Sequence, residues 1–367
     1  KKTKTVILDL IGGEPLLEAP LISDICDYFF KQCALKGCTL ASGARISIST
    51  NGQNYFEPQV QAFVKRFAPF LSLNVSIDGH KALHDAHRVD AAGNGSFDKA
   101  IKAYHAAAGL GGKQTKMTFV PASFPQMSEA ILFMLEQSPD FIAANYAYEP
   151  IYTPQDARVL YDQLKIVSDH LIATKRVIAC SILDHNIGYP VAKEDDKNYC
   201  GGSGGMLAFD TQGKAYPCLR YCPISIGKEK AEKICIGDMQ GIYNTPHTAK
   251  IRDYLDAITL SSQSTPECIN CPVGVGCGWC SAYNYESTGD VNRRVTNICW
   301  AHKGRTLASC YYHNKRYLEL RDTTPKAVLL PEKDALQIIP REEYEYLLRL
   351  QAEAEKVFLK EGGEDGI

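Results

Sequence analysis

"CINCPVGVGCGWC", the stretch from Cys268 to Cys280, places four cysteines within thirteen residues. Nine of the 14 cysteines of the chain lie between Cys200 and Cys299. Thiolates at such close spacing repel one another unless a bound metal compensates their charge. The spacing therefore predicts that this part of the chain is a metal-binding module.

Zinc, disulfides and iron–sulfur clusters are the three explanations for such a module. Disulfides are typical of short secreted domains, whereas these cysteines follow a long pattern of strands and helices. Two CxxC pairs fit a zinc site, but zinc needs only four ligands. Eight or nine thiols favour two [4Fe–4S] clusters with four thiolates each, and zinc stays the alternative. The candidate ligands are Cys200, Cys218, Cys222, Cys235, Cys268, Cys271, Cys277, Cys280 and Cys299.

The composition limits the class of protein. With 367 residues the chain is long enough for two or three domains. Its net charge of −2 favours neither a nucleic-acid nor a membrane partner. The apolar runs are only as long as strands and no signal peptide opens the chain, so we expect a cytoplasmic protein. Because "KKTKTVILDL" enters a strand almost at once, we also expect further residues upstream.

The first half alternates strand-like apolar runs with amphipathic helices, a pattern that predicts a parallel sheet or an open barrel. The predicted strands are Val6–Leu10, Arg45–Thr50, Phe70–Ile77, Thr115–Val120 and Phe141–Ala147. The predicted helices are Pro20–Gln32, Glu57–Phe67, Ser96–Ala108, Ser128–Gln137 and Thr153–Thr174.

Polar, glycine-rich turns follow the first three predicted strands. They are "GGEP" (Gly12–Pro15), "TNG" (Thr50–Gly52) and "DG" (Asp78–Gly79). In such folds the chemistry lies at the C-terminal ends of the strands, so we expect the three turns to line one mouth. Ordinary turn chemistry is the alternative for each turn taken alone.

The cysteine spacing resembles a known pattern. Cys200 is followed by twelve residues, Gly213, four residues and Cys218. With the five later cysteines this resembles the seven-cysteine SPASM domain of radical S-adenosylmethionine (AdoMet, or SAM) enzymes. The GGEP turn and "SIDGHKALHDAHR" (Ser76–Arg88) resemble barrel motifs of the same enzymes. The resemblance covers residues 1 to about 315. It implies an α/β fold, a partial (β/α)6 TIM-like barrel followed by a cysteine-rich SPASM domain and a C-terminal helix.

The resemblance divides the chain into four parts. A radical SAM partial barrel is expected at residues 1–175, with its first βα unit missing, and a bridge at 176–199. The SPASM auxiliary-cluster domain is expected at 200–315. A tail follows at 316–367, in which the sequence predicts a helix over Pro340–Gly363.

The resemblance also implies an AdoMet site at the strand ends. Glycines let the backbone approach the ligand, and the Glu14 carboxylate suits the methionine ammonium group. An arginine fork suits the AdoMet carboxylate, which is the role expected of Arg88, while Asp78 is expected to shape its own turn. The expected cofactor-binding residues are Gly12, Gly13, Glu14, Pro15, Ser49, Asn51, Ser76, Asp78 and Arg88.

By the same resemblance, the cysteines form two auxiliary [4Fe–4S] sites. Cys200, Cys218 and Cys280 are expected to hold the inner cluster, whose fourth ligand is Cys222, Cys235 or a cysteine of the substrate. Cys235 lies in "KICIGDM" (233–239), which predicts a strand. The outer cluster is expected on Cys268, Cys271, Cys277 and Cys299.

The CxxxCxxC motif that binds the AdoMet-cleaving cluster in this family is absent from the sequence. Cys26, Cys33 and Cys38 have a different spacing. We therefore expect a third, SAM-binding [4Fe–4S] cluster from missing N-terminal residues. Leu219 follows Cys218 where sulfatase-maturating relatives carry an aspartate, which argues against that activity.

The function implied by the resemblance is that of a radical SAM peptide maturase acting on a ribosomally synthesised precursor peptide. A 5′-deoxyadenosyl radical would start the reaction, and the expected product is a thioether crosslink from a cysteine to a carbon of another residue. The expected protein partner is a reductant such as flavodoxin or ferredoxin. The alternatives are a carbon–carbon crosslink, oxidation of serine or cysteine, or a zinc-stabilised binding protein without enzymatic activity.

Overall fold

The computed structural model describes residues 5–198, 200–203, 205–240 and 245–362. The chain divides into two compact units. The first comprises Lys1–Ala147, Val159–Asp184 and Lys315–Thr323. The second comprises Tyr148–Arg158, His185–Asn314 and Thr324–Ile367. Among the described residues, none of the helices has the length and apolar character needed to cross a bilayer.

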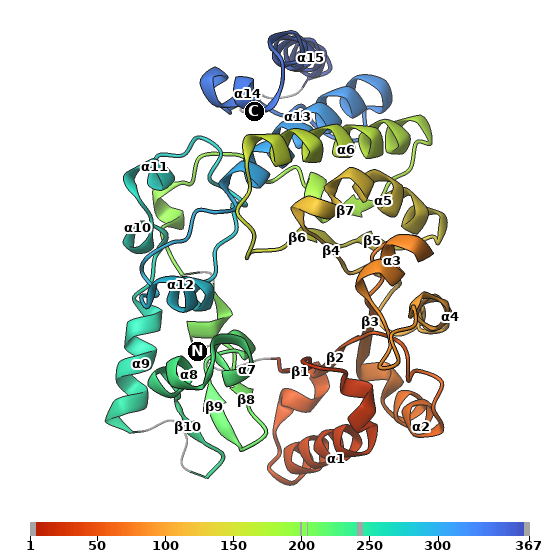
Figure 1. The fold of residues 1–367 in the computed structure, drawn as a ribbon, viewed down its shortest axis with the longest axis vertical. Helices are drawn as coiled ribbons and strands as arrows, with labels where there is room; N and C mark the ends of the chain where they lie inside the picture. The colour runs from red at the N-terminus through yellow and green to blue at the C-terminus, as the bar shows by residue number, and fades with distance from the viewer. Residues whose placement is uncertain (1–4, 199, 204, 241–244, 363–367) are drawn as a thin grey trace. The chain divides into compact units, whose positions relative to one another are not determined.

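Three parallel strands open the first unit (Figure 1). They are β1 (Ile7–Leu10), β2 (Arg45–Thr50) and β3 (Leu71–Val75), in the order β1-β2-β3. Leu10 lies opposite Ile48, and Thr50 lies opposite Val75. The three strands run in the same direction, so their C-terminal ends lie at one edge of the sheet. All three agree with the predicted strands to within two residues.

Helices α1 (Ala19–Leu35) and α2 (Pro58–Phe67) lie on the same side of these strands (Figure 1). α2 buries Val60, Phe63 and Phe67 on one face, as apolar residues at helical spacing do. Burying each such side chain contributes about 1.5–3 kcal/mol. The predicted helices at these two places are confirmed.

The rest of the first unit contains shorter parallel pairs. β4 (Met117–Phe119) pairs with β6 (Ala144–Tyr146), and β5 (Phe141–Ile142) pairs with β7 (Ala179–Cys180). The predicted strand Phe141–Ala147 is therefore two strands that pair with different partners. They part at Ala143, whose N–H donates to Thr115 Oγ1 and whose carbonyl accepts from the backbone of Met117.

Before Asp184, four more helices belong wholly or partly to this unit. Three of them, α4, α5 and α6, match predicted helices to within two residues. α3 was not predicted as a helix, and it occupies the middle of the stretch from Ser76 to Arg88. Their bounds are α3 (Lys81–His87), α4 (Phe97–Ala106), α5 (Met127–Glu136) and α6 (Pro154–Ala173).

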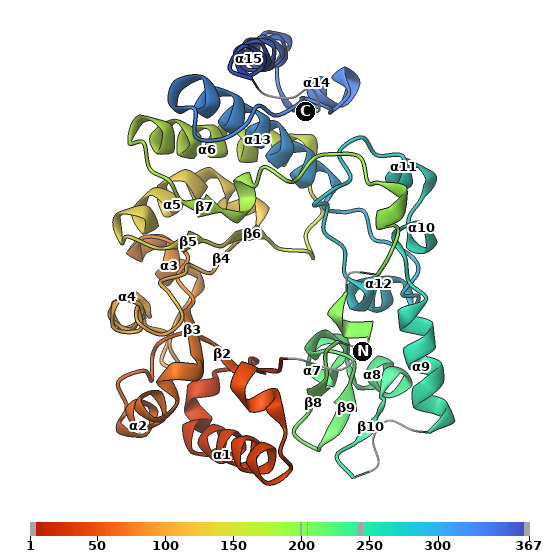
Figure 2. The same ribbon diagram turned by 180° about the vertical axis from the view of Figure 1, so that it is seen from behind.

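The second unit contains a small antiparallel sheet and many short helices. Its strands, in the order β10-β9-β8, are β8 (Ala208–Phe209), β9 (Lys214–Tyr216) and β10 (Gly237–Asp238). Figure 2 shows β8 and β9 beside α7 and α8. The helices are α7 (Pro223–Ile226), α8 (Lys228–Ile234), α9 (Pro246–Asp256), α10 (Leu260–Gln263), α11 (Pro266–Ile269), α12 (Ser281–Thr288), α13 (Cys299–Leu320), α14 (Glu332–Ile338) and α15 (Arg341–Lys360).

The strand predicted over "KICIGDM" is wrong in its first half. Lys233 belongs to α8, where its Nζ pairs with the Glu229 carboxylate at 3.1 Å, one turn earlier. Such i,i+4 pairs stabilise a helix. Cys235 follows the helix, and only Gly237 and Asp238 form the strand β10.

The C-terminal helix α15 confirms the predicted terminal helix, although the last predicted residue, Gly363, lies outside the described residues. Pro340 precedes the helix at the N-cap position. Leu347, Leu350 and Ala354 are buried on one face, and most of the charged side chains of the helix are exposed.

Candidate functional site

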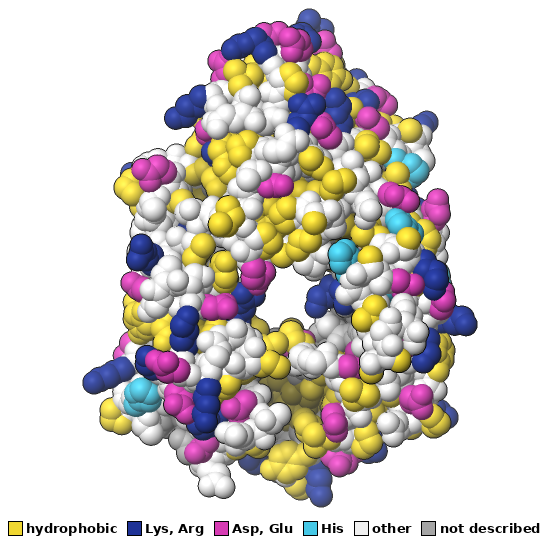
Figure 3. Space-filling view, viewed as in Figure 1, with side chains coloured by type: hydrophobic (Ala, Val, Ile, Leu, Met, Phe, Trp, Pro, Cys, Tyr) yellow, Lys and Arg dark blue, Asp and Glu magenta, His cyan; other side chains and the backbone are white. Residues whose placement is uncertain are grey.

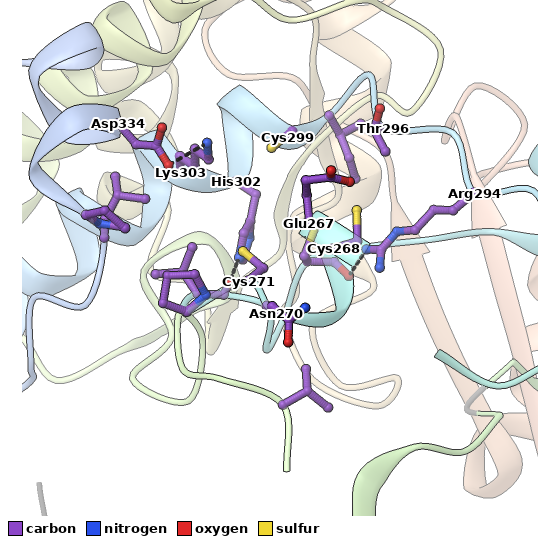
Figure 4. A pocket seen from close by; sticks show the side chains of 18 of the residues that line it. Glu267, Cys268, Asn270, Cys271, Arg294, Thr296, Cys299, His302, Lys303 and Asp334 are labelled. Carbon is purple, nitrogen blue, oxygen red and sulfur yellow. Dashed lines mark hydrogen bonds and ion pairs between the residues drawn. The ribbon is translucent and has the colours of Figure 1, made fainter. Parts of the chain in front are cut away.

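Four cysteines line one cavity of about 530 Å³ in the second unit. They are the four residues expected to hold the outer cluster: Cys268, Cys271, Cys277 and Cys299. Cys268 lies on α11, Cys271 follows that helix and Cys299 begins α13 (Figure 4). Tight turns connect the first three, because the N–H of Cys271 donates to the carbonyl of Cys268 and the N–H of Cys277 donates to that of Gly274. The local backbone thus brings four thiols to the lining of one space.

Two thiols of this cavity, Cys277 and Cys299, have a raised pKa and so hold their protons more firmly than an exposed thiol. Burial raises the pKa of Cys277 to about 11, although the nearby Arg294 guanidinium opposes the rise. Burial also raises the pKa of Cys299, and there Lys303 opposes it. A metal that binds here must displace these protons, so its affinity must increase with pH.

Cys200, Cys218 and Cys280 form a second group of thiols, the three expected at the inner cluster. A Cβ atom added to Gly202 would lie 3.5 Å from Cys200 Sγ and 3.4 Å from Cys218 Sγ. Both sulfurs therefore face the same glycine. The pKa of Cys218 is raised to about 11, chiefly by burial, and the thiols of Cys280 and Cys200 add to the rise.

Backbone amides are directed at two of these inner thiols. Two N–H groups of the turn η8 (Leu219–Tyr221) face the Cys218 sulfur, and two N–H groups at the start of α12 face that of Cys280. Burial is the larger effect and raises the pKa of both thiols, whereas these amides lower it. Amide donors of this kind stabilise a thiolate, which is the form that binds metal.

The two metal hypotheses require different arrangements of the thiols. Within the described residues, no three His, Cys, Asp or Glu side chains converge closely enough to hold one metal ion. Tetrahedral zinc draws its sulfur ligands to about 2.3 Å from a single point. A cubane cluster is instead bound by thiolates that stand apart around its faces.

Cys222 and Cys235 are the predicted candidates for the fourth ligand of the inner cluster. Cys222 is buried in an apolar cluster, and its thiol donates to the carbonyl oxygen of Cys218 at 3.9 Å. The Cys235 thiol donates to the carbonyl oxygen of Gly237 at 3.4 Å. Burial raises the pKa of Cys222 to about 11, and the Cys218 thiol adds to this rise. Cys222 therefore lies close to the inner group.

The GGEP turn meets the end of β2 through Glu14. The carboxylate accepts hydrogen bonds from Thr50 Oγ1 at 2.6 Å and from the backbone N–H of Asn51 at 2.7 Å. Gly12 and Gly13 have φ values of 101° and 53°, which side chains disfavour. The structure thus places the GGEP and TNG turns together, and Pro15 begins the short helix that follows.

The other strand-end residues continue this edge. The N–H of Ser76 donates to the carbonyl of Thr50 at 2.9 Å, which links the ends of β2 and β3. Ser49 Oγ accepts from Lys116 Nζ at 3.1 Å. The Asn51 side chain accepts from the backbone N–H two residues later. The expected AdoMet residues of the first three strands are therefore neighbours.

Asp78 and Arg88 form an ion pair across the third turn. Arg88 Nε lies 2.5 Å from Asp78 Oδ2, and Nη2 lies 3.3 Å from Oδ1. Asp78 also accepts a hydrogen bond from the backbone N–H of Thr118. Asp78, Thr118 and Ser123 all line a cavity of about 200 Å³. Arg88 is thus held by a carboxylate of this chain.

Two of the three cysteines with unsuitable spacing have packing roles. Cys26 and Cys33 lie on the buried face of α1. Burial raises the pKa of Cys26 to about 11, which keeps its thiol neutral. A neutral, buried thiol behaves as a small apolar side chain.

Three polar residues near the thiols were not identified from the sequence. His302, one turn after Cys299, lines the outer cavity and is 2% exposed (Figure 4). Its Nε2 contacts the carbonyl of Val273, its Nδ1 has no hydrogen-bond partner, and burial lowers its pKa to about 3. Ser281 and Tyr221 lie at the inner group. The sequence feature that could have identified these three residues was their closeness in the chain to the cysteines.

Together the strands, helices and cysteine-rich unit define the class of fold. They confirm the fold expected from the sequence, a partial (β/α)6 barrel followed by a cysteine-rich domain and a C-terminal helix.

Solved structures share this fold. Native anSMEcpe with bound AdoMet and Kp18Cys peptide matches with a TM-score of 0.56 at 17% identity, over 86% of this chain and 85% of that chain. Native anSMEcpe with bound AdoMet alone matches with a TM-score of 0.57 at 16% identity, over 84% and 83%. SuiB of Streptococcus suis bound to precursor peptide SuiA matches with a TM-score of 0.50 at 15% identity, over 80% and 64%. No family model and no curated protein matches the sequence.

Proposed function

We propose that this chain is a radical SAM peptide maturase with two auxiliary [4Fe–4S] clusters. The observation that carries the proposal is the outer cavity, where four cysteines line one space. Three further thiols form the inner group in the same unit. The fold is shared with structures that hold AdoMet or a precursor peptide, which supports the same ligands for this chain. We also propose a cytoplasmic location and a flavodoxin or ferredoxin as reductant.

The chain's own residues suggest how it would serve such a reaction. When bound, AdoMet with its [4Fe–4S] cluster supplies a 5′-deoxyadenosyl radical. The role of the strand-end turns is to orient the ligand. Glu14 offers a carboxylate to an ammonium group at a turn whose glycines leave room for it. Arg88, already paired with Asp78, is assigned to the same mouth.

We propose that a further strand and helix, which carry the CxxxCxxC motif, pack against β1 and α1. In the described part of the chain β1 pairs only with β2. An apolar stripe is exposed on and beside α1 at helical spacing, and Figure 3 shows apolar surface there at the bottom of the view. Its members are Leu17, Leu21, Ile25, Tyr28 and Leu35. An open strand edge beside such a stripe suits another parallel βα unit.

Thioether formation is the finer reaction that we propose. It fits an inner cluster with an open ligand position, because both Cys222 and Cys235 donate their thiols to backbone carbonyls. A substrate cysteine would then have a place beside Cys218. Leu219 packs against the apolar cluster of this unit and supplies no acid or base. Carbon–carbon crosslinking and oxidation of serine or cysteine are the alternative reactions.

The first prediction concerns metal content. Protein purified without oxygen should contain about eight iron atoms per chain from the two auxiliary clusters, since each cubane contains four. Iron analysis with quantitative zinc measurement tests this. Stoichiometric zinc with little iron would overturn the proposal in favour of a zinc-stabilised binding protein.

A second prediction concerns the fourth inner ligand. If a substrate cysteine fills the position, Cys222→Ala should leave the electron paramagnetic resonance (EPR) spectrum of the reduced inner cluster unchanged, and precursor peptide should shift it. Cys235→Ala tests the other candidate ligand in the same way and should also leave the spectrum unchanged, because its thiol too is bound to a backbone carbonyl. A changed spectrum in Cys222→Ala without peptide would assign the ligand to Cys222 instead.

A further inference from the structure

Two buried hydroxyl groups form a chain that ends at an inner thiol. The Tyr221 hydroxyl donates to Ser281 Oγ at 3.0 Å, and Ser281 Oγ lies 3.7 Å from Cys200 Sγ. Tyr221 is fully buried, and Ser281 is 2% exposed. Water is therefore kept from both hydroxyls, and each must find its partner within the protein.

The positions of these two residues follow from the cysteines around them. Ser281 is the first residue of α12 and directly follows Cys280. Tyr221 closes the turn η8, which begins immediately after Cys218. The segments that contain Cys218 and Cys280 thus also position the two hydroxyl groups in the hydrogen-bonded chain that ends at the third inner thiol, Cys200.

The direction of the hydrogen bonds is fixed once Cys200 binds metal. A metal-bound thiolate has no proton, so it can only accept. Ser281 must then donate to Cys200 Sγ, while its oxygen accepts from Tyr221. The tyrosine bond polarises the serine hydroxyl and strengthens its donation, as in other buried chains of hydrogen bonds.

We propose that Ser281, polarised by Tyr221, raises the reduction potential of the inner auxiliary cluster. This inference rests on the proposed function, which places a cluster on Cys200, Cys218 and Cys280. Reduction adds negative charge that spreads onto the thiolates, and a hydrogen bond to a cluster sulfur stabilises that charge. The hydrogen bonds from Tyr221 through Ser281 to Cys200 therefore favour electron uptake at the inner cluster. This is the cluster beside the proposed substrate position.

The test is a redox titration of the full chain with dithionite and dye mediators, in which EPR monitors the reduced clusters. Ser281→Ala should make the inner cluster about tenfold harder to reduce at a fixed potential, which corresponds to about 59 mV for a one-electron couple. Tyr221→Phe should shift the potential in the same direction by less. Ser281→Thr keeps the hydroxyl and should restore the potential of the unmodified protein. The outer cluster is an internal control, since its potential should not move.

Tyr285→Phe is the matched control for loss of a hydroxyl. It removes a tyrosine hydroxyl from α12 that donates instead to the backbone of Lys230, so the inner potential should stay unchanged. If Ser281→Ala fails to retain iron, the shift in Tyr221→Phe decides alone. Equal inner potentials in the iron-loaded Tyr221→Phe and unmodified proteins would overturn this inference while leaving the proposed function intact. An unmodified protein without iron would overturn the proposed function itself.

Discussion

Cys299→Ala should lower the iron content of the purified chain from about eight atoms to about four, because one of the two cubanes loses a ligand. Cys299 is the first residue of α13, and it lines the outer cavity together with Cys268, Cys271 and Cys277. The substitution leaves one iron of the outer cubane without its thiolate. Since cluster binding is coupled to folding, the soluble yield should fall as well.

Cys310→Ala is the matched control, because it makes the same substitution on the same helix. Cys310 is 1% exposed, its thiol donates to the carbonyl of Ala327 at 3.3 Å, and burial raises its pKa to about 12. This thiol has no place at either group of cysteines, so its variant should keep about eight irons. Iron analysis and EPR of both variants check the prediction. A Cys299→Ala protein with its full iron content would remove Cys299 from the outer site.

Strands whose side chains are buried at every second position could be predicted from the sequence. The prediction failed where the pairing of a strand with its neighbours determines its bounds. β2 matches its prediction residue for residue, because alternate side chains such as Ile46 and Ile48 are buried. The run at 141–147 reads as one strand, but Ala143 separates two strands that pair with different neighbours. Pairing of distant segments leaves no local signal in the sequence.

The same distinction applies to the candidate site. Cysteine spacing predicted the outer set, and the structure brings its four members together around one cavity. Ser281 and Tyr221 escaped notice because single serines and tyrosines are common, and only the fold aligns their hydroxyls with Cys200. Arg88 was assigned to AdoMet on its chemistry, whereas the turn supplies it with a carboxylate partner in Asp78. The type of a residue determines which groups its side chain can bind, and the fold determines which of those groups lies within its reach.

Glu14→Ala should weaken AdoMet binding to the full-length protein by at least about tenfold and leave the auxiliary iron content unchanged. The Glu14 carboxylate accepts from Thr50 Oγ1, from the N–H of Asn51 and from the N–H of Leu16 at 3.1 Å. A hydrogen bond to a charged group contributes about 1.5–3 kcal/mol, so alanine releases a turn that these bonds fix. It also removes the negative charge proposed to meet the methionine ammonium group.

Two further variants separate these two causes. Glu18→Ala removes an exposed carboxylate four residues later whose side chain makes no capping hydrogen bond, so AdoMet affinity should be unchanged. Glu14→Gln keeps an oxygen for Thr50 and Leu16 but loses the charge. If the carboxylate meets the ammonium group, Glu14→Gln should bind AdoMet almost as weakly as Glu14→Ala; if Glu14 only fixes the turn, most of the affinity should return. Equilibrium binding of AdoMet, measured together with iron content, decides between these two causes. Normal AdoMet affinity in Glu14→Ala would place the AdoMet pocket away from this turn, because no other carboxylate in Gly12–Pro15 can replace Glu14.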